Sequence, residues 1–456
     1  MKTKLEHFFK LRENGTNIST ELTAGLTTFM TMAYILAVNP NILSDVFGAA
    51  MDWGAVFTAT ALASALATLL MGVWAKYPLA IAPGMGLNAF FSYTVGSVFG
   101  WHIASIAVFA EGLIFVLLSL FRVREKVFEA IPKNLKYAIG AGIGLFIAFI
   151  GLVNGGVVTG GAGTPVSLGN LSSLTVILTL VGIVITMIFL AFKIKGALLW
   201  GILATWAIGI VCQFTGLYAV NPEIGMYSLI PSGVFSAPPS IAGYTIVDAF
   251  QNVGASFGGT IFDFIVILFA FLFIDVFDTV GAVIGLAEKA GLADKDGKIP
   301  RIREVFLCDA SGTILGAAFG SSTATTYIES AAGVAEGGRT GLTSVTVAAL
   351  FGAALFFSPV FSAIPAFATA PALVVIGYFM MESITKIDFR DITEGIPAFL
   401  TIAMMPLSYS IAEGIIFGLL SYVILKLATG RHKEISAVML IVSVLFALRL
   451  VAKAFG

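Results

Sequence analysis

The sequence predicts an all-α, polytopic membrane protein. Of its 456 residues, 58% are hydrophobic and only 11% are charged, whereas ordinary soluble proteins carry about 25% charged residues. The mean hydropathy is +0.99. Long hydrophobic runs recur along the whole chain, as expected for helices that cross a bilayer. The net charge is −1 and the sequence has no basic tract or zinc-ligand spacing, so nothing in it indicates nucleic-acid binding.

The hydrophobic runs form two sets of seven, separated by a polar, Pro- and Gly-rich connection at 218–260. Runs of roughly 17–25 residues are long enough to span a membrane as helices. We therefore predict fourteen spans. The first set lies at about 22–38, 54–75, 81–98, 103–121, 135–153, 174–192 and 196–218, and the second at about 261–287, 304–319, 321–337, 342–363, 367–384, 394–409 and 411–428.

Basic residues predict the orientation of these spans. The N-terminal segment 1–15 is charged and does not resemble a cleavable signal peptide, so the first span is expected to direct insertion. Lys and Arg occur in this segment and in the even-numbered connections, but not in the odd-numbered connections 39–53, 154–173 and 218–260. The positive-inside rule then places the N-terminus in the cytoplasm. The topology of the C-terminal segment, 429–456, stays open, because 435–453 could span the membrane or lie on its surface.

An odd number of spans in each half gives the two halves opposite orientations, as in transporters built from inverted repeats. Such proteins bind substrate where interrupted helices of the two repeats meet. The third and tenth spans are interrupted at matching positions, by Pro and Gly in Ala82–Phe91 and by a Ser/Thr-rich run in Gly320–Ser330. In both we expect a short extended segment that leads into a half-helix, with the two helix N-termini facing each other. Free N–H groups there bind polar or anionic groups.

Two acids, Asp275 and Asp278, directly follow the apolar run Phe264–Ile274. Their i, i+3 spacing places both on one face of a helix. An acid within a bilayer costs about 3 kcal/mol on insertion scales, which indicates a functional role, although one of them could instead cap a helix or pair with a neighbour. The three histidines lie at or outside the predicted membrane boundaries, so a proton relay would have to use carboxylates. Two neighbouring buried acids should not both be ionised, and this is the basis of a proton-coupled site.

Asn88 and Glu329 stand where the extended segments of spans three and ten should become helical. Together with Asp275 they would suit a flat heterocycle with N–H groups on one edge and a carbonyl on another. Glu329 could alternatively be a stabilising charge at a helix N-terminus, and Asn88 could be structural. For the remaining acids, we expect a structural hydrogen bond for Glu111 and a solvated or capping position near a span end for Asp309.

Several stretches resemble the nucleobase–cation symporter-2 (nucleobase–ascorbate transporter) family, in particular its AzgA-like purine (guanine/hypoxanthine) permease branch. The stretches are Gly25–Pro40, Ala82–Phe91, Phe273–Gly281, Gly320–Gly333 and Pro397–Gly414. The resemblance implies a UraA-type 7+7 inverted repeat of 14 transmembrane spans with short extended segments in spans 3 and 10. It further implies a core domain at 22–121 and 261–363 and a gate domain at 135–218 and 367–428.

The resemblance implies that the protein would be a proton-coupled importer of purine nucleobases in the cytoplasmic membrane, with hypoxanthine and guanine as substrates and adenine as the alternative. It would be a homodimer without cofactor or metal. Asp275 and Glu329 would be the principal purine-binding acids, and Asn88, Gly86 and Ala89 would complete the site. Asp278, together with Asp275, would serve proton coupling.

Three alternative functions can be weighed against this interpretation. An anion transporter on the same fold would need Lys or Arg near the half-helices, and spans three, eight and ten contain none. An intramembrane enzyme would need a nucleophile–base pair or a metal site, and the chain offers neither membrane histidines nor paired cysteines there. A passive channel stays open, although titratable acids in the middle of the membrane suit a coupled carrier better.

Overall fold

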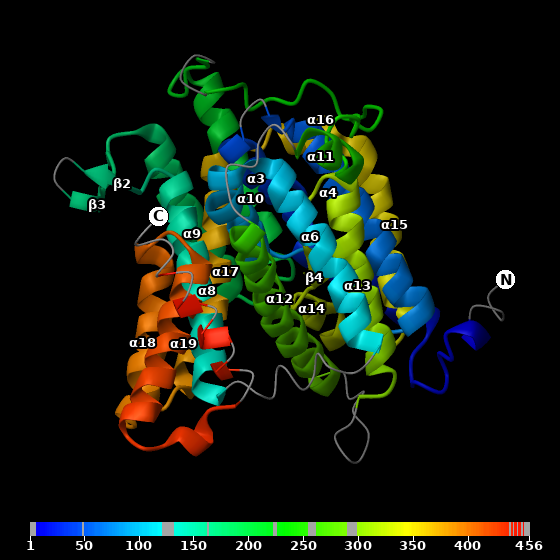
Figure 1. The fold of residues 1–456 in the computed structure, drawn as a ribbon. Coiled ribbons are helices and arrows are strands. Elements are labelled where there is room, and N and C mark those ends of the chain that lie inside the picture. The colour runs from blue at the N-terminus through cyan, green and yellow to red at the C-terminus, as the bar shows by residue number, and fades with distance from the viewer. Residues whose placement is uncertain are drawn as a thin grey trace.

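The structure is a computed structural model that describes residues 6–450 except 48–49, 121–131, 162–163, 222–225, 254–260, 290–298, 437–438, 441, 445 and 448–449. It is a bundle of long helices with two small two-stranded sheets (Figure 1). Within the described residues, nine helices are long and apolar enough to cross a membrane. The multi-pass membrane architecture is thus confirmed, and the total of fourteen spans stays a prediction.

The elements of the first half are α2 (Ile18–Met32), α3 (Ile35–Phe47), α4 (Trp53–Leu70), η2 (Met71–Ala75), β1 (Ile81–Pro83), α5 (Met85–Ala89), η3 (Phe90–Gly96), α6 (Ser97–Leu120), α8 (Lys133–Asn154), β2 (Val158–Gly161), β3 (Thr164–Leu168), α9 (Leu174–Ala191), α10 (Ala197–Phe214) and α11 (Ile246–Asn252). Those of the second half are α12 (Ile261–Lys289), α13 (Ile302–Phe319), β4 (Ala324–Thr326), α14 (Ser330–Ala335), α15 (Gly341–Ala354), η6 (Leu355–Phe357), α16 (Ser358–Ser362), α17 (Ala366–Met381), η7 (Glu382–Lys386), α18 (Ile392–Leu407), α19 (Ile411–Ala428) and η8 (His432–Glu434).

Most predicted spans agree with observed helices to within a few residues, and three features were not predicted. The first span is two helices, α2 and α3, separated at Ala33 and Tyr34, and it begins earlier than predicted because Asn17 caps α2. The connection after α8 contains the β2–β3 hairpin, and the connection before α12 contains α11, which starts with a capping box at Thr245. These elements are short and polar, so hydropathy did not reveal them.

The two halves of the chain pack against each other helix by helix. The fifth and twelfth predicted spans, α8 and α17, are in close contact and meet at Gly144 and Gly377. A Cβ at Gly144 would lie 2.6 Å from the carbonyl oxygen of Gly377. Small residues permit such close backbone approach in membranes, where van der Waals packing, rather than hydrophobicity, holds helices together. Other extensive contacts join α6 to α13, α15 to α2 and α4, and α18 to α19.

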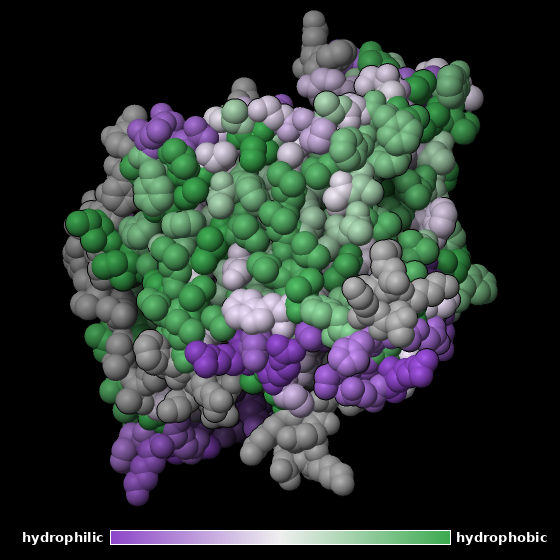
Figure 2. Space-filling view, turned by 90° about the vertical axis from the view of Figure 1, so that its right-hand side faces the viewer, coloured by the Kyte–Doolittle hydropathy of each residue, from purple (hydrophilic) through white to green (hydrophobic). Residues whose placement is uncertain are grey.

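The surface carries a broad apolar belt. Figure 2 shows hydrophobic residues across the middle of the molecule and hydrophilic residues along its lower edge. Exposed apolar side chains on α9, such as Val184, Met187 and Ile188, extend the apolar surface to another helix. The segment 435–453 lies partly outside the described residues, but Phe446 is buried and packs edge-on against Phe269 of α12. Its topology stays open.

A crossing of two broken helices as the candidate functional site

The strands β1 and β4 form a short antiparallel ladder in the interior of the protein. Ile81 pairs with Thr326, Ala82 with Thr325 and Pro83 with Ala324. Gly84 N–H donates to the carbonyl of Thr323, and Tyr327 N–H donates to that of Ala80, so the ladder continues beyond both strand ends. Pro83 is buried, and the other five strand residues are at most 2% exposed. Because the extended chains pair with each other, non-helical backbone is tolerated at this depth.

Each strand leads directly into a helix, as predicted for spans three and ten. Gly84 is the N-cap of α5 and Glu329 is the N-cap of α14. Gly84 has no side chain to cap α5, and the Glu329 side chain accepts no hydrogen bond from the first turn of α14. Because the strands are antiparallel, the two helices leave from opposite ends of the ladder, and both helix N-termini lie beside it. We call this meeting point of β1–α5 with β4–α14 the crossing. The local sequences explain the break: Pro83 and the three β-branched threonines of Thr323–Thr326 favour extended backbone.

Neighbouring helices hold the ladder with polar side chains. The Thr68 hydroxyl of α4 bonds both the N–H and the carbonyl of Ile81, at 2.9 and 3.0 Å. Asp309 of α13 accepts from the N–H and the hydroxyl of Thr326, at 2.8 and 2.9 Å. Asp309 is fully buried, so the expectation of a solvated or capping position was wrong. Sequence distance from the span end could not reveal that β4 folds back onto α13. Glu111 makes the expected structural bond, to the Thr323 hydroxyl at 2.9 Å.

Asp275 belongs to a buried cluster centred on Thr279. The Thr279 hydroxyl oxygen lies 2.8 Å from an Asp275 carboxylate oxygen, 2.9 Å from one of Asp309 and 2.6 Å from the hydroxyl of Thr325. Asp275, Thr279 and Asp309 are all fully buried. This cluster attaches α12 to both α13 and the crossing.

Asp278, one turn further along α12, faces the start of α5. A Cβ built on Gly84 would lie 3.3 Å from a carboxylate oxygen of Asp278. Its side chain is partly exposed, unlike that of Asp275.

Glu329 lies on the other side of the crossing and is held by a tyrosine. Tyr34, in the break between α2 and α3, donates its hydroxyl to Glu329 at 2.8 Å. Tyr327, two residues before Glu329, donates to the carbonyl of Pro83 at 2.6 Å. The Tyr34 hydroxyl fixes the orientation of the Glu329 carboxylate, and Tyr327 ties the β4 end to β1.

Asn88 bridges the two broken helices. It is fully buried, its Oδ1 accepts from the Ser322 hydroxyl, and its Nδ2 lies 3.5 Å from the carbonyl of Pro83. Gly86 lies against α8, since a Cβ there would be 2.8 Å from the Ile143 Cγ2 atom, and Ala89 is buried beside it. Among the described residues, no group of three or more His, Cys, Asp or Glu side chains is placed to hold a metal ion.

The structure thus brings all the predicted site residues to one crossing and adds several that were missed: Tyr34, Thr279, Ser322, Thr325 and Tyr327. Tyr34 stands in a largely apolar run and could have been selected as an intramembrane hydrogen-bond donor. Tyr327 lies within the Ser/Thr-rich run 320–330, where no local pattern distinguishes it from its polar neighbours. Thr279 directly follows Asp278, but its contact with Asp309 joins residues 30 positions apart. No local spacing predicts that contact.

Substitution of Gly84 by Ala tests how tightly the crossing is packed. The new Cβ would lie 2.6 Å from the Thr325 methyl group, so β1 and β4 would have to move apart, at a cost of about 1–3 kcal/mol. We expect a lower melting temperature and strongly reduced substrate uptake. Gly352→Ala in α15 is the matched control, because a Cβ there meets nothing within 4 Å. Wild-type uptake by the Gly84→Ala variant would contradict the close packing described here.

Comparison with other proteins agrees with this architecture. The chain matches the model of a permease family over residues 19–417. It is 44% identical to a guanine/hypoxanthine permease of Bacillus subtilis, with 97% of this chain and 99% of the relative covered. It is 40% identical to an adenine permease of Escherichia coli, with 98% and 96% covered. It is also 47% identical to a putative permease of Methanocaldococcus jannaschii, with 98% of each chain covered.

Solved structures share the fold at much lower sequence identity. The transmembrane domain of a cyanobacterial bicarbonate transporter aligns with a TM-score of 0.61 at 15% identity, covering 86% of this chain and 96% of that one. A murine anion transporter of solute carrier family 26, in its inward-facing state, aligns with a TM-score of 0.61 at 12% identity, covering 94% and 72%. These likenesses confirm the predicted UraA-type fold. Family model, full-length relatives and fold agree: the chain belongs to the nucleobase–ascorbate transporter family of permeases, in the group with the guanine/hypoxanthine and adenine permeases.

Proposed function

We propose that this protein is a proton-coupled importer of purine nucleobases, with hypoxanthine and guanine as substrates. The observation that carries the proposal is the crossing itself, where two helix N-termini meet Asp275, Asp278 and Glu329. We place the protein in the cytoplasmic membrane as a homodimer with a cytoplasmic N-terminus. The names of its full-length relatives, which are guanine/hypoxanthine and adenine permeases, support a purine as the substrate.

Glu329 and Asp275 are proposed to accept hydrogen bonds from the purine N–H groups. Hydrogen bonds to a charged acceptor are worth about 1.5–3 kcal/mol each. Glu329 is partly exposed and its carboxylate is held by Tyr34. Asp275 is buried, and the contact between Gly86 and Ile143 of α8 covers the nearby start of α5. In this proposal the purine reaches Asp275 only after the crossing and α8 have moved apart.

Asn88 supports an oxopurine rather than adenine. The Ser322 hydroxyl takes one of the two lone pairs of the Asn88 Oδ1, and the Nδ2 of the same amide is a hydrogen-bond donor. Nδ2 has two hydrogens, and the Pro83 carbonyl takes one of them at most, over a long 3.5 Å contact. The second hydrogen can be donated to the C6 carbonyl of hypoxanthine or guanine. Adenine has an amino group at this position and could not accept it.

Hydrogen counting around Thr279 supports proton binding in the acid cluster. A hydroxyl has one hydrogen, yet Thr279 lies within 2.9 Å of carboxylate oxygens of both Asp275 and Asp309. If both acids were ionised, only one of these contacts could be a hydrogen bond. Both can be hydrogen bonds when one carboxyl carries a proton and donates it to Thr279. We propose that Asp278, which is partly exposed, exchanges the transported proton with water.

Alternating access would move a core domain (22–121 and 261–363) against a gate domain (135–218 and 367–428). Contacts between these proposed domains occur at both ends of their boundary. Lys195 pairs with Glu336 at 2.5 Å, and Asn154 donates to the Tyr93 hydroxyl at 3.2 Å. One of these two contacts would have to open for the site to face each side of the membrane in turn.

The anion-transporter alternative has weaker support. The solved structures with a similar fold include anion transporters. At 12–15% sequence identity, this similarity supports a shared fold but not a shared substrate. The charged side chains that the structure describes at the crossing are carboxylates, and these would repel a bicarbonate or sulfate ion.

Uptake of labelled hypoxanthine into proteoliposomes tests the proposed function. An inside-alkaline pH gradient should drive accumulation above the external concentration, and unlabelled guanine should compete better than adenine, because adenine lacks the carbonyl that Asn88 would bind. An uptake rate and final accumulation that do not change with the pH gradient would show that transport is not coupled to protons. Transport of labelled bicarbonate, without any hypoxanthine uptake, would establish the anion alternative instead.

A further inference from the structure

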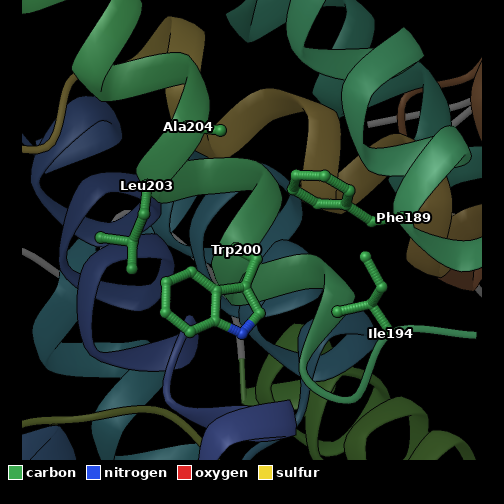
Figure 3. A pocket seen from close by; sticks show the side chains of 5 residues that line it. All are labelled: Phe189, Ile194, Trp200, Leu203 and Ala204. Atoms are coloured by element: carbon green, nitrogen blue, oxygen red, sulfur yellow. The ribbon is translucent and has the colours of Figure 1, made fainter.

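A shallow apolar pocket lies between the end of α9 and the start of α10. Its volume is about 390 Å³, and it is lined by Phe189, Ile194, Trp200, Leu203 and Ala204. Figure 3 shows the Phe189 ring directed from α9 toward the α10 helix that carries Trp200 and Ala204, with Ile194 below it. Trp200 is 44% exposed and Ile194 is 40% exposed. The pocket is therefore open to the surroundings of the protein.

The pocket opens onto the membrane-facing surface. On α9, Val184 and Met187 are more than 50% exposed, and on α10 Val211 is 60% exposed. Exposed apolar side chains of this kind are typical of helices that face lipid. Tryptophan is enriched where such helices meet the polar boundary of a bilayer, and Trp200 lies in the first turn of α10. From this position of Trp200 we infer that the pocket lies where the acyl chains of a bilayer meet their headgroups.

The turn that borders the pocket is basic. It contains Lys193 and Lys195, on either side of the lining residue Ile194. Lys195 is bound to Glu336 at 2.5 Å. Lys193 is exposed and forms no ion pair with any residue that the structure describes. One unpaired positive charge therefore lies at the polar edge of an apolar pocket.

We propose that this pocket binds an anionic phospholipid, with one acyl chain between α9 and α10 and the phosphate headgroup at Lys193. The apolar lining alone cannot select one lipid over another, because all lipid tails are similarly apolar and no hydrophobic driving force operates inside the bilayer. The selectivity comes from the charge of Lys193, since a basic residue at the membrane surface favours anionic lipids by about fivefold. The pocket shape, with Phe189 opposite Trp200, holds the chain.

Native mass spectrometry of the full-length protein, released from bilayers of phosphatidylcholine and phosphatidylglycerol, tests this proposal. The wild type should retain phosphatidylglycerol over phosphatidylcholine by about fivefold relative to their proportion in the bilayer. Lys193→Gln should reduce this preference to near one. Ala204→Trp, which fills the pocket, should lower the retention of both lipids. Lys433→Gln is the matched control, because Lys433 is also exposed but neither lines the pocket nor belongs to the turn that borders it.

Two results would overturn the proposal. The first is a loss of the expected charge preference: the wild type retains the two lipids in proportion to their abundance, and Lys193→Gln behaves like it. The second is an Ala204→Trp variant that changes from dimer to monomer while its lipid retention is unchanged, since this would assign the face to a second copy of the chain. Monodisperse elution and an unchanged melting temperature establish that each variant is folded. The lipid readout is independent of transport, so failure of the proposed purine transport leaves this test valid.

Discussion

Replacement of Asp275 by Asn is expected to weaken hypoxanthine binding by about 10- to 150-fold, the equivalent of one hydrogen bond to a charged acceptor. The amide keeps one oxygen but loses the negative charge, and its N–H groups face the purine N–H donors that the carboxylate would accept. The substitution also changes the bond to Thr279, so binding and stability must be measured separately. Titration of the purified protein with labelled hypoxanthine gives the affinity, and a melting curve gives the stability.

The control for this experiment is Asp263→Asn, which makes the same chemical change near the start of the same helix. Asp263 lies more than three turns before Asp275 and contributes nothing to the proposed site. The Asp263→Asn variant should therefore bind hypoxanthine with the same affinity as the wild type. Wild-type affinity in the Asp275→Asn variant would show that this acid does not contact the purine, and Glu329→Gln would then become the decisive variant.

Replacement of Asp278 by Asn is expected to separate exchange from accumulation. With one proton moved per purine, a gradient of one pH unit can support about a tenfold accumulation. An amide cannot carry the proton, so the variant should exchange internal for external hypoxanthine but should reach only equal concentrations under the gradient. Proteoliposomes loaded with unlabelled hypoxanthine measure exchange, and empty ones with an imposed gradient measure accumulation.

The same Asp263→Asn variant serves as control and should retain both activities. If Asp278→Asn still accumulates hypoxanthine about tenfold, the proton is carried elsewhere, and the Asp275–Thr279–Asp309 cluster is the next candidate. If both exchange and accumulation are lost, Asp278 is required for binding or for the packing against Gly84.

The candidate site was predictable to the extent that local sequence encodes it. Pro83, Gly84 and the threonine run before Glu329 interrupt otherwise apolar segments, and both interruptions are observed as strand followed by helix. The spacing of Asp275 and Asp278 placed them on one helix. The partners of these acids were not predictable, because Tyr34 reaches Glu329 across 295 positions and Ser322 reaches Asn88 across 234.

Asp309 shows most clearly that local sequence does not predict contacts between distant residues. From its position alone it was expected to be solvated or to cap a helix, yet it is fully buried and holds the N–H and hydroxyl of Thr326. The sequence contains the acid and the threonine but not the fold-back that joins them. Likewise, the sequence predicts two buried acids on α12, whereas Asp278 is partly exposed and only Asp275 is fully buried.

The sequence by itself determined the membrane class, the approximate limits of most spans, the broken helices and the acids that line their meeting point. These properties follow from hydropathy, from the backbone preferences of Pro, Gly and β-branched residues, and from the cost of a charge in the bilayer. Only the tertiary structure decided the pairing of β1 with β4, the cluster around Thr279, and the contact of Gly144 with Gly377. Each of these joins residues from distant helices, and packing of the whole bundle, rather than any local pattern, brings them together.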